Sequence, residues 1–483
     1  SRGLGDVYKR QCMSGCRRRS GSYATASRRT IRRSRCVCVL RLLTWNVEHK
    51  FDQVARDPRF TFVGNTTVTA SAAAPPHSSS VHVPLSEIAP YYTHVLFAYG
   101  ASDARHLHVP GSAPGELRGV CAALDFVQWY NGHPDAHANG SMFRTLDGAR
   151  LRHVGIVGAG NVALDVARMI LRQSRFAPRD ESLVHTDTPE PVLECLRSWA
   201  VEQVDLYVRR GAAQLAFTNK ELREMLSLPH APFRPLDSTH LDAAIAEAAA
   251  YSDVGHKRAM SRLLQQLKKG SKRVWDPSHA PRWGLHLLRS PAALHGDHDG
   301  VVKCAEWDVT EIDEGGAAKR TGARETSDVD LLVASVGYRS RPLAGAHAHL
   351  LLPFDAGRAV VPNIRSRVVD EEGAVQPGMY VSGWLANGPV GVIASTMMDA
   401  YAVADEMLAD WLQTSGRARR TLCGSLGHRE ALAGVPAALR AQRTVSYDEW
   451  LQIDAAERQR GVPLGKEREK FLTVEDMLRV VGK

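Results

Sequence analysis

The sequence lacks any run of about 18 consecutive apolar residues, the length that a membrane-spanning helix requires. It also lacks a CxxC pair among the thiols that follow residue 41, which are Cys121, Cys195, Cys304 and Cys423. Without such pairs, neither a zinc site nor a disulfide framework is indicated, and scattered thiols favour a reducing compartment. We therefore expect no transmembrane segment and no metal site.

The body of the chain also lacks an excess of charge of either sign. The net charge is +9, but residues 1–41 hold twelve Lys and Arg and only one acid, Asp6. The remaining residues carry 49 basic and 51 acidic side chains. A nearly neutral body gives little electrostatic support for nucleic-acid binding, so we expect no nucleic-acid partner.

The first 41 residues differ from the rest in composition. Residues 1–11, SRGLGDVYKRQ, match the translation of a sequencing-library adaptor and are predicted to be an artefact. Residues 12–41 are rich in Arg and Ser, which suits either an organelle transit peptide or out-of-frame or intron translation; we favour the second. Residues 1–41 are thus expected to be a non-native or disordered segment outside the fold.

Strand and helix patterns alternate along the rest of the chain, which is typical of an α/β fold. Strands are predicted at residues 60–70, 94–101, 153–157 and 201–211, and in three runs, RWGLHLLRSP, VVKCAEWDVTEIDE and DVDLLVASVGYRSRPL, of one module. Helices are predicted at residues 117–130, ended by Asn131-Gly132 and Pro134, and at 161–172 and 219–228. A polar, Ala-rich helical region is predicted at about 239–269, and a strand, turn and long helix over 378–412.

The stretch HVGIVGAGNVALDVARMILR joins a strand to a helix through a glycine-rich turn. In this G-x-G-x-x-A pattern Gly158 permits the tight turn, Gly160 lets backbone N–H groups approach a pyrophosphate, and Ala163 keeps the helix close to its strand. Small residues also serve plain strand–helix packing. Because strand and helix are both in register, we favour nucleotide binding, with the phosphates at the helix N-terminus.

The end of the next strand indicates which nucleotide. An NAD enzyme needs a carboxylate there for the ribose 2′-hydroxyl, but Arg209 and Arg210 follow VDLYV. Two guanidinium groups could hold a 2′-phosphate bidentately. The alternative is a pair of solvated arginines; beside the glycine turn, we favour NADP.

A third motif is GWLANGPVGVIASTMMDA, residues 383–400. Trp384 follows a predicted strand, Gly388-Pro389 forces a turn, and Gly391-Val392-Ile393 begins a helix. An indole beside a helix N-terminus suits a flavin ring, which has a polar edge and apolar faces. An ordinary helix start in an α/β fold is the alternative.

These motifs resemble those of the mitochondrial-type adrenodoxin reductases, a family of NADPH–ferredoxin oxidoreductases. The resemblance covers most of residues 47–483 and is carried by YGASDARHLHVPG, FVQWYNGHPD, GNVALDVAR, VRRGAAQLAFTNKELREM, SVGYRSRP, GWLANGPVGVIASTMMD and VSYDEWLQIDAAERQRG. It implies two Rossmann-like domains. The NADP-binding domain, residues 151–352, would be inserted into a discontinuous FAD-binding domain, residues 42–150 and 353–483.

The resemblance also implies the cofactor contacts. NADP would be bound by Gly158, Ala159, Gly160, Asn161, Val162, Arg209, Arg210 and Glu221. FAD would be bound by Trp384, Val392 and Ile393, and Gly391 would touch both cofactors. No catalytic side chain or metal is expected, because the flavin carries the chemistry. Asp165 matches a family carboxylate near the flavin, although a carboxylate favoured by the helix dipole is the simpler interpretation.

The family's electron acceptor is an acidic two-iron ferredoxin. The implied docking surface lies near Lys257, Arg258 and Arg262, followed by Lys268, Lys269, Lys272 and Arg273. Such a patch would speed the encounter with an anionic partner, whereas the alternative is a solvated helix face. The resemblance further implies a mitochondrial location, and we expect a monomer.

The family begins with its own strand–GxGxxG–helix unit for FAD, which we do not find within residues 1–60. The first FAD-binding unit is thus predicted to be missing by N-terminal truncation, so that this chain binds FAD poorly, aggregates or is inactive. The alternative function is a degenerate NADP-binding protein lacking flavin and redox activity. A glutamate-synthase-type subunit would need cysteine clusters for iron–sulfur centres, and a simple NADP dehydrogenase would leave GWLANGPVGVI without a purpose.

Overall fold

The computed structural model of the chain describes residues 51–70, 80–138, 141–179, 181–345, 351–391, 393–413, 439 and 443–483. The predicted non-native segment 1–41 lies outside these residues, as does most of the stretch 1–60 discussed for the first FAD-binding unit. Among the described helices, none is long and apolar enough to cross a membrane.

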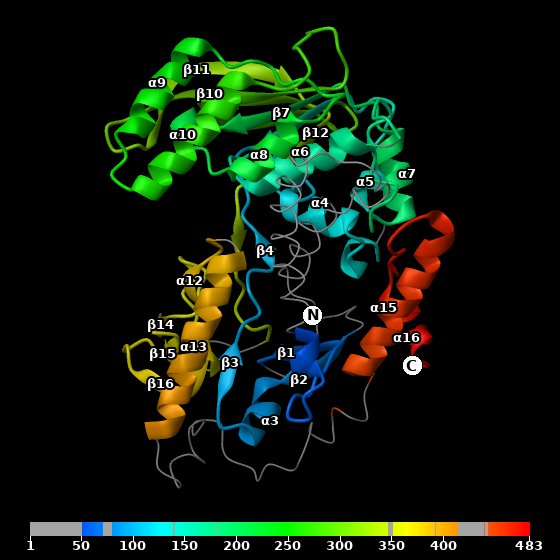
Figure 1. Cartoon of the computed structure of the whole chain (residues 1–483), viewed down its shortest axis with the longest axis vertical. Helices are drawn as coiled ribbons and strands as arrows, with labels where there is room; N and C mark the ends of the chain where they lie inside the picture. The colour runs from blue at the N-terminus through cyan, green and yellow to red at the C-terminus, as the bar shows by residue number, and fades with distance from the viewer. Residues whose placement is uncertain are drawn as a thin grey trace, which may run out of the picture. The chain divides into compact units, whose positions relative to one another are not determined.

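The chain divides into two compact units, whose elements are shown in Figure 1. Unit 1 consists of the chain up to Asp103 together with Tyr338–Glu457 and Val474–Lys483; unit 2 consists of Ala104–Gly337 and Arg458–Thr473. The short strands β4 (Asp103–Ala104) and β13 (Tyr338–Arg339) lie where the chain passes from one unit to the other. Residues 104–150, assigned above to the FAD-binding domain, therefore pack with unit 2.

Unit 2 is built on a parallel sheet that carries the glycine turn. Its five strands follow the order β5 (Val120–Ala122), β12 (Leu331–Ala334), β6 (His153–Val157), β7 (Gln203–Val208) and β8 (Arg282–Leu287). The central strands are buried on both faces: Ile156, Leu206 and Val333 are fully inaccessible on one face. On the other face Leu332 is fully inaccessible, and Val157 and Tyr207 are no more than 5% exposed. This explains their nearly continuous apolar sequence and confirms the strands predicted at residues 153–157 and 201–211.

The helices of unit 2 include those predicted, with one correction, and two that were not predicted, α5 and α7. They are α4 (Ala123–Tyr130), α5 (Met142–Thr145), α6 (Asn161–Gln173), α7 (Glu190–Ser198), α8 (Asn219–Leu226), α9 (Ser238–Ala249) and α10 (Val254–Lys269), with 3-10 turns at Pro134–Ala136 and Ala212–Gln214. The helix predicted from residue 117 is wrong at its start, because Val120–Ala122 pairs with β12 before Asp125 caps the helix. The helical region predicted at 239–269 is confirmed and consists of two helices; the second, α10, begins where Asp253 accepts a hydrogen bond from the His256 N–H.

A separate antiparallel sheet of β9 (Arg289–Gly296), β10 (Val302–Ile312) and β11 (Ala318–Asp328) completes unit 2. The Trp307 ring of β10 stacks on Tyr207 of β7, with centroids 3.7 Å apart and planes within 7°. Both rings belong to a buried cluster with Val157, Leu294 and Val302. The run predicted at residues 301–314 is therefore a strand, over residues 302–312, but it lies in a second sheet.

Residues 458–473 also pack in unit 2, far in sequence from its other residues. The Lys466 side chain is 1% exposed, and its Nζ donates to the Thr188 carbonyl at 2.6 Å and to Glu469 at 2.5 Å. Lys470 donates to the Asn131 carbonyl at 3.1 Å. Buried ammonium groups need such partners, so this C-terminal segment is an integral part of unit 2.

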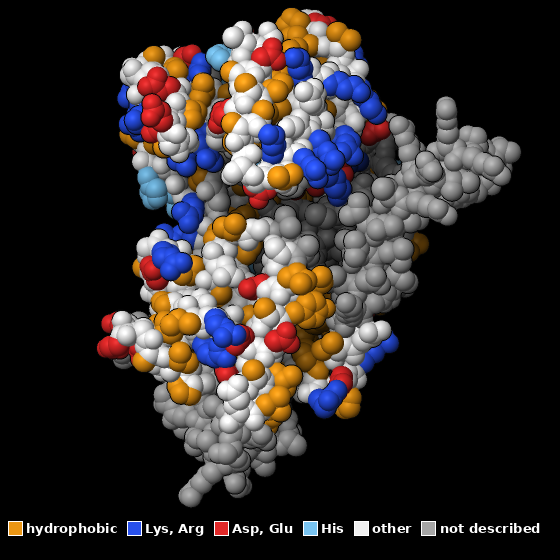
Figure 2. Space-filling model, turned by 60° about the vertical axis from the view of Figure 1, so that its left-hand side comes forward, with side chains coloured by type: hydrophobic (Ala, Val, Ile, Leu, Met, Phe, Trp, Pro, Cys, Tyr) orange, Lys and Arg blue, Asp and Glu red, His pale blue; other side chains and the backbone are white. Residues whose placement is uncertain are grey.

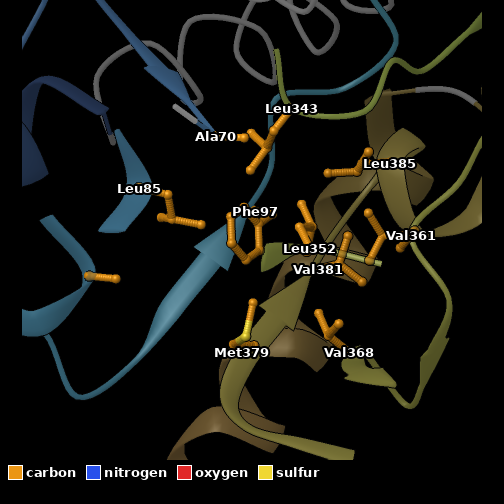
Figure 3. Packing of buried hydrophobic residues seen from close by; sticks show 12 residues of the cluster. Ala70, Leu85, Phe97, Leu343, Leu352, Val361, Val368, Met379, Val381 and Leu385 are labelled. Carbon is orange, nitrogen blue, oxygen red and sulfur yellow. The ribbon is translucent and has the colours of Figure 1, made fainter. Parts of the chain in front are cut away.

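Unit 1 contains a four-stranded sheet in the order β14 (Asn363–Ile364), β15 (Arg367–Val369), β16 (Val375–Val381) and β3 (Val95–Phe97), in which β3 and β16 are parallel. Strands β1 (Thr66–Thr69) and β2 (Val81–Pro84) form a second, parallel pair. Leu85, Phe97 and Val381 meet in one buried cluster (Figure 3). The strand predicted at 94–101 is confirmed over residues 95–97, and that at 60–70 over residues 66–69.

The helices of unit 1 include the long helix predicted after GWLANGP. They are α3 (Leu85–Ile88), α12 (Trp384–Asn387), α13 (Ile393–Gln413), α15 (Tyr447–Gly461), which ends in unit 2, and α16 (Val474–Val480), with 3-10 turns at Ala89–Tyr91 and, in unit 2, at Val462–Leu464. Asp410 fixes α13 to the sheet by accepting hydrogen bonds from Arg367 and Tyr380.

Another face of α13 exposes apolar side chains. This exposed stripe consists of Met398, Tyr401, Leu408 and Leu412, each at least half accessible. Figure 2 shows hydrophobic side chains gathered on the surface of unit 1. Contiguous exposed apolar surface of this kind favours self-association.

Candidate functional site: a glycine turn in unit 2 and a tryptophan turn in unit 1

The glycine turn of unit 2 connects β6 directly to α6. Gly158 has φ +147°, and a Cβ atom placed there would lie 2.3 Å from the Ser335 carbonyl oxygen. Its N–H donates to the Tyr207 carbonyl at 3.0 Å, while the Ser335 N–H donates to the Val157 carbonyl at 2.7 Å. The turn is thus fixed between two neighbouring strands, and only glycine fits its first position.

The second glycine of the turn leaves open space. Gly160 precedes the first residue of α6 with extended backbone angles, φ −104° and ψ 168°. A Cβ atom there would meet nothing within 4 Å. Ala163 is fully buried, so the helix approaches the sheet closely. The N-terminal N–H groups of α6 therefore open onto a site that a phosphate could approach, as the sequence predicts.

The two arginines follow β7 at the same edge of the sheet. Val157 is in register with Tyr207, so the turn after β6 and the residues after β7 lie side by side. Arg209 is exposed and Arg210 is half-buried. Their carbonyls accept hydrogen bonds from the Thr310 hydroxyl at 2.7 Å and the Leu288 N–H at 3.3 Å, which fixes the backbone of both residues. That both guanidinium groups bind one 2′-phosphate stays a prediction.

The chain returns to the glycine turn after the arginines. The Ala216 N–H donates to the Ala159 carbonyl at 2.9 Å, and the Asn161 side chain accepts a hydrogen bond from the Thr218 N–H at 2.7 Å. Asn161 thus links the start of α6 to the start of α8, on which Glu221 lies. Seven of the predicted NADP residues, Gly158 to Val162, Arg209 and Arg210, consequently gather at one edge of the sheet, and α8 brings Glu221 toward them.

An ion cluster between α6 and α8 was missed by the sequence analysis. Arg168 of α6 lies 2.5 Å from Asp165, 3.6 Å from Glu221 and in contact with Glu224. Burial raises the pKa of Asp165 to about 6, and Arg168 only partly opposes this effect. The i,i+3 spacing of Asp165 and Arg168 was visible in the sequence. The contacts to α8 were not, because they depend on how the helices pack.

The tryptophan turn of unit 1 joins β16 to α13. Gly383, with φ +65°, begins the short helix α12, and Gly388, with φ +81°, ends it. The half-buried Trp384 ring stacks on Tyr338, with centroids 5.7 Å apart. A hydrogen bond from Asn363 to the Ala386 carbonyl, at 3.2 Å, holds the turn against the sheet.

The residues after this turn lead into α13. Gly391 is exposed and has φ +94°, and a Cβ atom there would lie 2.5 Å from the Ser395 hydroxyl oxygen. Val392 lies outside the described residues, and of Ile393 only the backbone is described. The structure thus places Trp384 and Gly391 in one connection of unit 1. The predicted contact of Gly391 with both cofactors is not tested.

One cavity of the described residues lies elsewhere. It measures about 320 Å³ and is lined by Gln203, Asp205, Arg234, Trp275, Pro277, Arg282 and Trp283. Gln203 and Arg282 begin β7 and β8, so the cavity lies at the amino ends of strands whose carboxyl ends face the glycine turn. Its buried carboxylate, Asp205, lies 3.2 Å from His286. The cavity therefore lies at the opposite end of the strands from the glycine turn.

Comparison with known proteins agrees with these motifs, although no family model matches the chain. The chain is 36% identical to human mitochondrial NADPH:adrenodoxin oxidoreductase over 452 residues, covering 90% of this chain and 82% of the human protein. It is 34% identical over 440 residues to Mycobacterium tuberculosis NADPH-ferredoxin reductase FprA, covering 90% and 86%. The structure of M. tuberculosis FprA in complex with NADPH superposes with a TM-score of 0.71 at 31% identity, covering 91% and 87%. The chain belongs to the NADPH:adrenodoxin oxidoreductase and NADPH-ferredoxin reductase family.

Proposed function

We propose that the chain is a flavoprotein oxidoreductase that transfers electrons from NADPH through FAD to a two-iron ferredoxin. Its membership of the adrenodoxin and ferredoxin reductase family supports this activity. The observation that carries the NADPH half is the glycine turn with its open face at Gly160 and two arginines on the neighbouring strand. That combination suits a nucleotide with an additional phosphate.

On the NADP side, each group has a distinct task. The N-terminal N–H groups of α6, at Asn161 and Val162, would hold the pyrophosphate, because they lack partners within the helix. Arg209 and Arg210 would bind the 2′-phosphate and so discriminate NADPH from NADH. Glu221, which α8 brings toward the turn, would bind farther along the nucleotide.

On the flavin side, unit 1 offers an aromatic ring beside the start of a long helix. Trp384, Gly391, Val392 and Ile393 would hold the flavin, and the positive φ of Gly391 suits a close approach of the backbone. FAD, when bound, supplies the conversion between hydride transfer and single-electron transfer. The protein's own contribution is to bind and align the cofactors, so we assign no catalytic side chain.

The acceptor would dock on the basic face of α10. Arg258, Arg262, Lys269 and Lys272 are exposed, and among the described side chains no carboxylate forms an ion pair with them. Lys257 instead donates to the Ala249 carbonyl, and Lys268 pairs with Asp242 at 2.7 Å. We therefore place the docking surface around Arg258 and Arg262, with Lys257 beside them. Unpaired positive charge speeds the encounter with an acidic ferredoxin.

The location of the protein is proposed from its relatives. The human and bovine relatives are named as mitochondrial proteins, whereas FprA is a protein of Mycobacterium tuberculosis. We propose a mitochondrial location and a monomeric protein, which fractionation and sedimentation would test.

The decisive experiment measures cofactor preference and electron transfer together. NADPH should reduce ferricyanide, and should reduce cytochrome c when a two-iron ferredoxin is added, in a preparation that shows flavin absorbance. Changing both Arg209 and Arg210 to Ala should raise the Kd for NADPH about 100-fold, because each lost charged contact weakens binding by roughly 1.4 kcal/mol. The Kd for NADH, which has no 2′-phosphate, should stay unchanged. An equal loss of affinity for NADPH and for NADH would contradict the proposal that the two arginines bind the 2′-phosphate. Binding of NADPH without flavin or electron transfer would instead support the degenerate-protein alternative.

A further inference from the structure

Asp399 lies near the start of α13 and reaches back to the preceding turn. Its Oδ2 atom accepts hydrogen bonds from the Gly383 N–H at 2.8 Å and from the Ser382 hydroxyl at 3.2 Å. Its Oδ1 atom accepts a third, from the Asn387 side-chain amide at 3.2 Å. One carboxylate thus binds both ends of the segment that carries Trp384.

The segment needs a side-chain acceptor because its backbone leaves the hydrogen-bond ladder between β16 and β3 at Gly383. Ser382 still donates its N–H to the Phe97 carbonyl of β3, but Gly383 turns to φ +65° and ψ −141°. Its N–H therefore has no strand partner and is donated to Asp399. Ser382 is buried, and its hydroxyl finds its acceptor in the same oxygen atom. Buried polar groups without such an acceptor would destabilise the turn.

The position of Asp399 connects two elements that act together in the proposed function. Gly391 and Ile393 lead into the helix that carries Asp399, and Trp384 lies in the turn that Asp399 binds. We propose that Asp399 is a positioning residue that fixes Trp384 relative to the N-terminus of α13, and so sets the shape of the flavin-contacting surface. Its consequence for flavin rests on the proposed function; its effect on the turn does not.

The chemistry of the contacts favours a carboxylate over an amide. Both oxygens of Asp399 accept, so three donors are satisfied at once. An asparagine has a single acceptor oxygen, and its NH2 group would face a donor, either the Asn387 amide or the Gly383 N–H. Asp399→Asn should therefore keep part of the contact, whereas Asp399→Ala removes all of it.

The test first measures the environment of Trp384 without cofactor and then measures FAD binding. The full-length protein is labelled with 5-fluorotryptophan, and the ¹⁹F resonance of Trp384 is identified by its loss in Trp384→Phe. Wild type is compared with Asp399→Ala, Asp399→Asn and the control Asp405→Asn, which changes an exposed carboxylate of the same helix. FAD affinity is then measured by quenching of flavin fluorescence, and thermal unfolding is recorded for each variant.

We expect the Trp384 resonance to shift or broaden in Asp399→Ala, less so in Asp399→Asn, and not in Asp405→Asn. The Kd for FAD should rise about tenfold in Asp399→Ala, as for the loss of one charge-assisted hydrogen bond. An unchanged Trp384 resonance in folded Asp399→Ala or Asp399→Asn would overturn the proposal, even if thermal stability fell. If wild type bound no FAD, the proposed function would fail, and the resonance would still decide the role of Asp399.

Discussion

The two candidate turns of the molecule connect a strand to a helix in different ways. In unit 2 only residues 158–160 separate β6 from α6, and neighbouring main chain holds the turn through the Tyr207 carbonyl and the Ala216 N–H. In unit 1 the connection from β16 to α13 includes the short helix α12, and a distant side chain, Asp399, holds it. The first turn is held by main-chain groups of neighbouring segments, and the second by a side chain of the helix into which it leads.

This difference predicts how each turn responds to substitution. A turn held by main chain fails when a side chain does not fit, and it tolerates changes at positions that face open space. A turn whose two ends are bound by one carboxylate loses its shape when that carboxylate is removed. The following predictions test the contrast and the charged groups around it.

The largest effect is expected at Gly158. Gly158→Ala places Cβ 2.3 Å from the Ser335 carbonyl oxygen at a φ of +147°, so we expect the free energy of unfolding to fall by about 3 kcal/mol. Gly160→Ala is the matched control, because its Cβ meets nothing within 4 Å. The free energy of unfolding of Gly160→Ala should stay within about 0.5 kcal/mol of the wild-type value, but its NADPH binding should be weaker. Urea unfolding and NADPH titration measure both effects, and equal destabilisation of the two variants would contradict this account of the turn.

A second effect concerns the pH dependence of unit 2. Burial raises the pKa of folded Asp165 to about 6 from 3.8. The stability that this carboxyl contributes is therefore complete below about pH 4 and is lost as pH rises through 6. Asp165→Asn should become more stable than wild type by up to about 3 kcal/mol at pH 8 and show little gain near pH 4. Urea unfolding across this range measures the difference; a gain that is independent of pH would refute the assignment.

A smaller effect is expected on the docking surface. Arg258→Glu with Arg262→Glu should slow ferredoxin reduction about tenfold at low salt, and the difference should shrink as salt screens the charges. Ferricyanide reduction by NADPH should stay unchanged. The control Lys319→Glu alters an exposed cation on β11 instead. Comparable slowing by the control would show that total charge matters and that the α10 face does not.

The smallest effect on stability is expected along the exposed stripe of α13. The double variant Leu408→Lys and Leu412→Lys changes two side chains that are 55% and 66% accessible. Its free energy of unfolding should therefore differ from that of wild type by no more than about 0.5 kcal/mol. The protein should be a monomer at low concentration, and in the variant the weak self-association expected of wild type at high concentration should decrease, because the apolar surface is interrupted. Sedimentation velocity compares the variant with Gln413→Lys, which adds charge outside the stripe. Unchanged self-association would mean that the exposed stripe is not the surface through which the molecules associate.

Sequence patterns were most informative where spacing alone decides structure. The strand–turn–helix at residues 153–172 and the strand ending at Val208 were predicted because apolar periodicity and glycine spacing are local. Residues 120–122 were wrongly included in a helix, since their partner β12 is more than 200 residues away and its pairing overrides local preference. The roles of Arg168 and Asp399 were likewise not anticipated, because a half-buried charged group finds its partners only when helices and turns meet.

The passage of the C-terminal segment through unit 2 has a practical consequence for dissecting the protein. A fragment spanning residues 104–337 appears self-contained in sequence, but it would omit Lys466 and Lys470. The Thr188 and Asn131 carbonyls that now accept their ammonium groups would lose those donors. A nucleotide-binding module intended for separate expression would therefore need residues 458–473 attached through an added linker, or supplied as a second polypeptide.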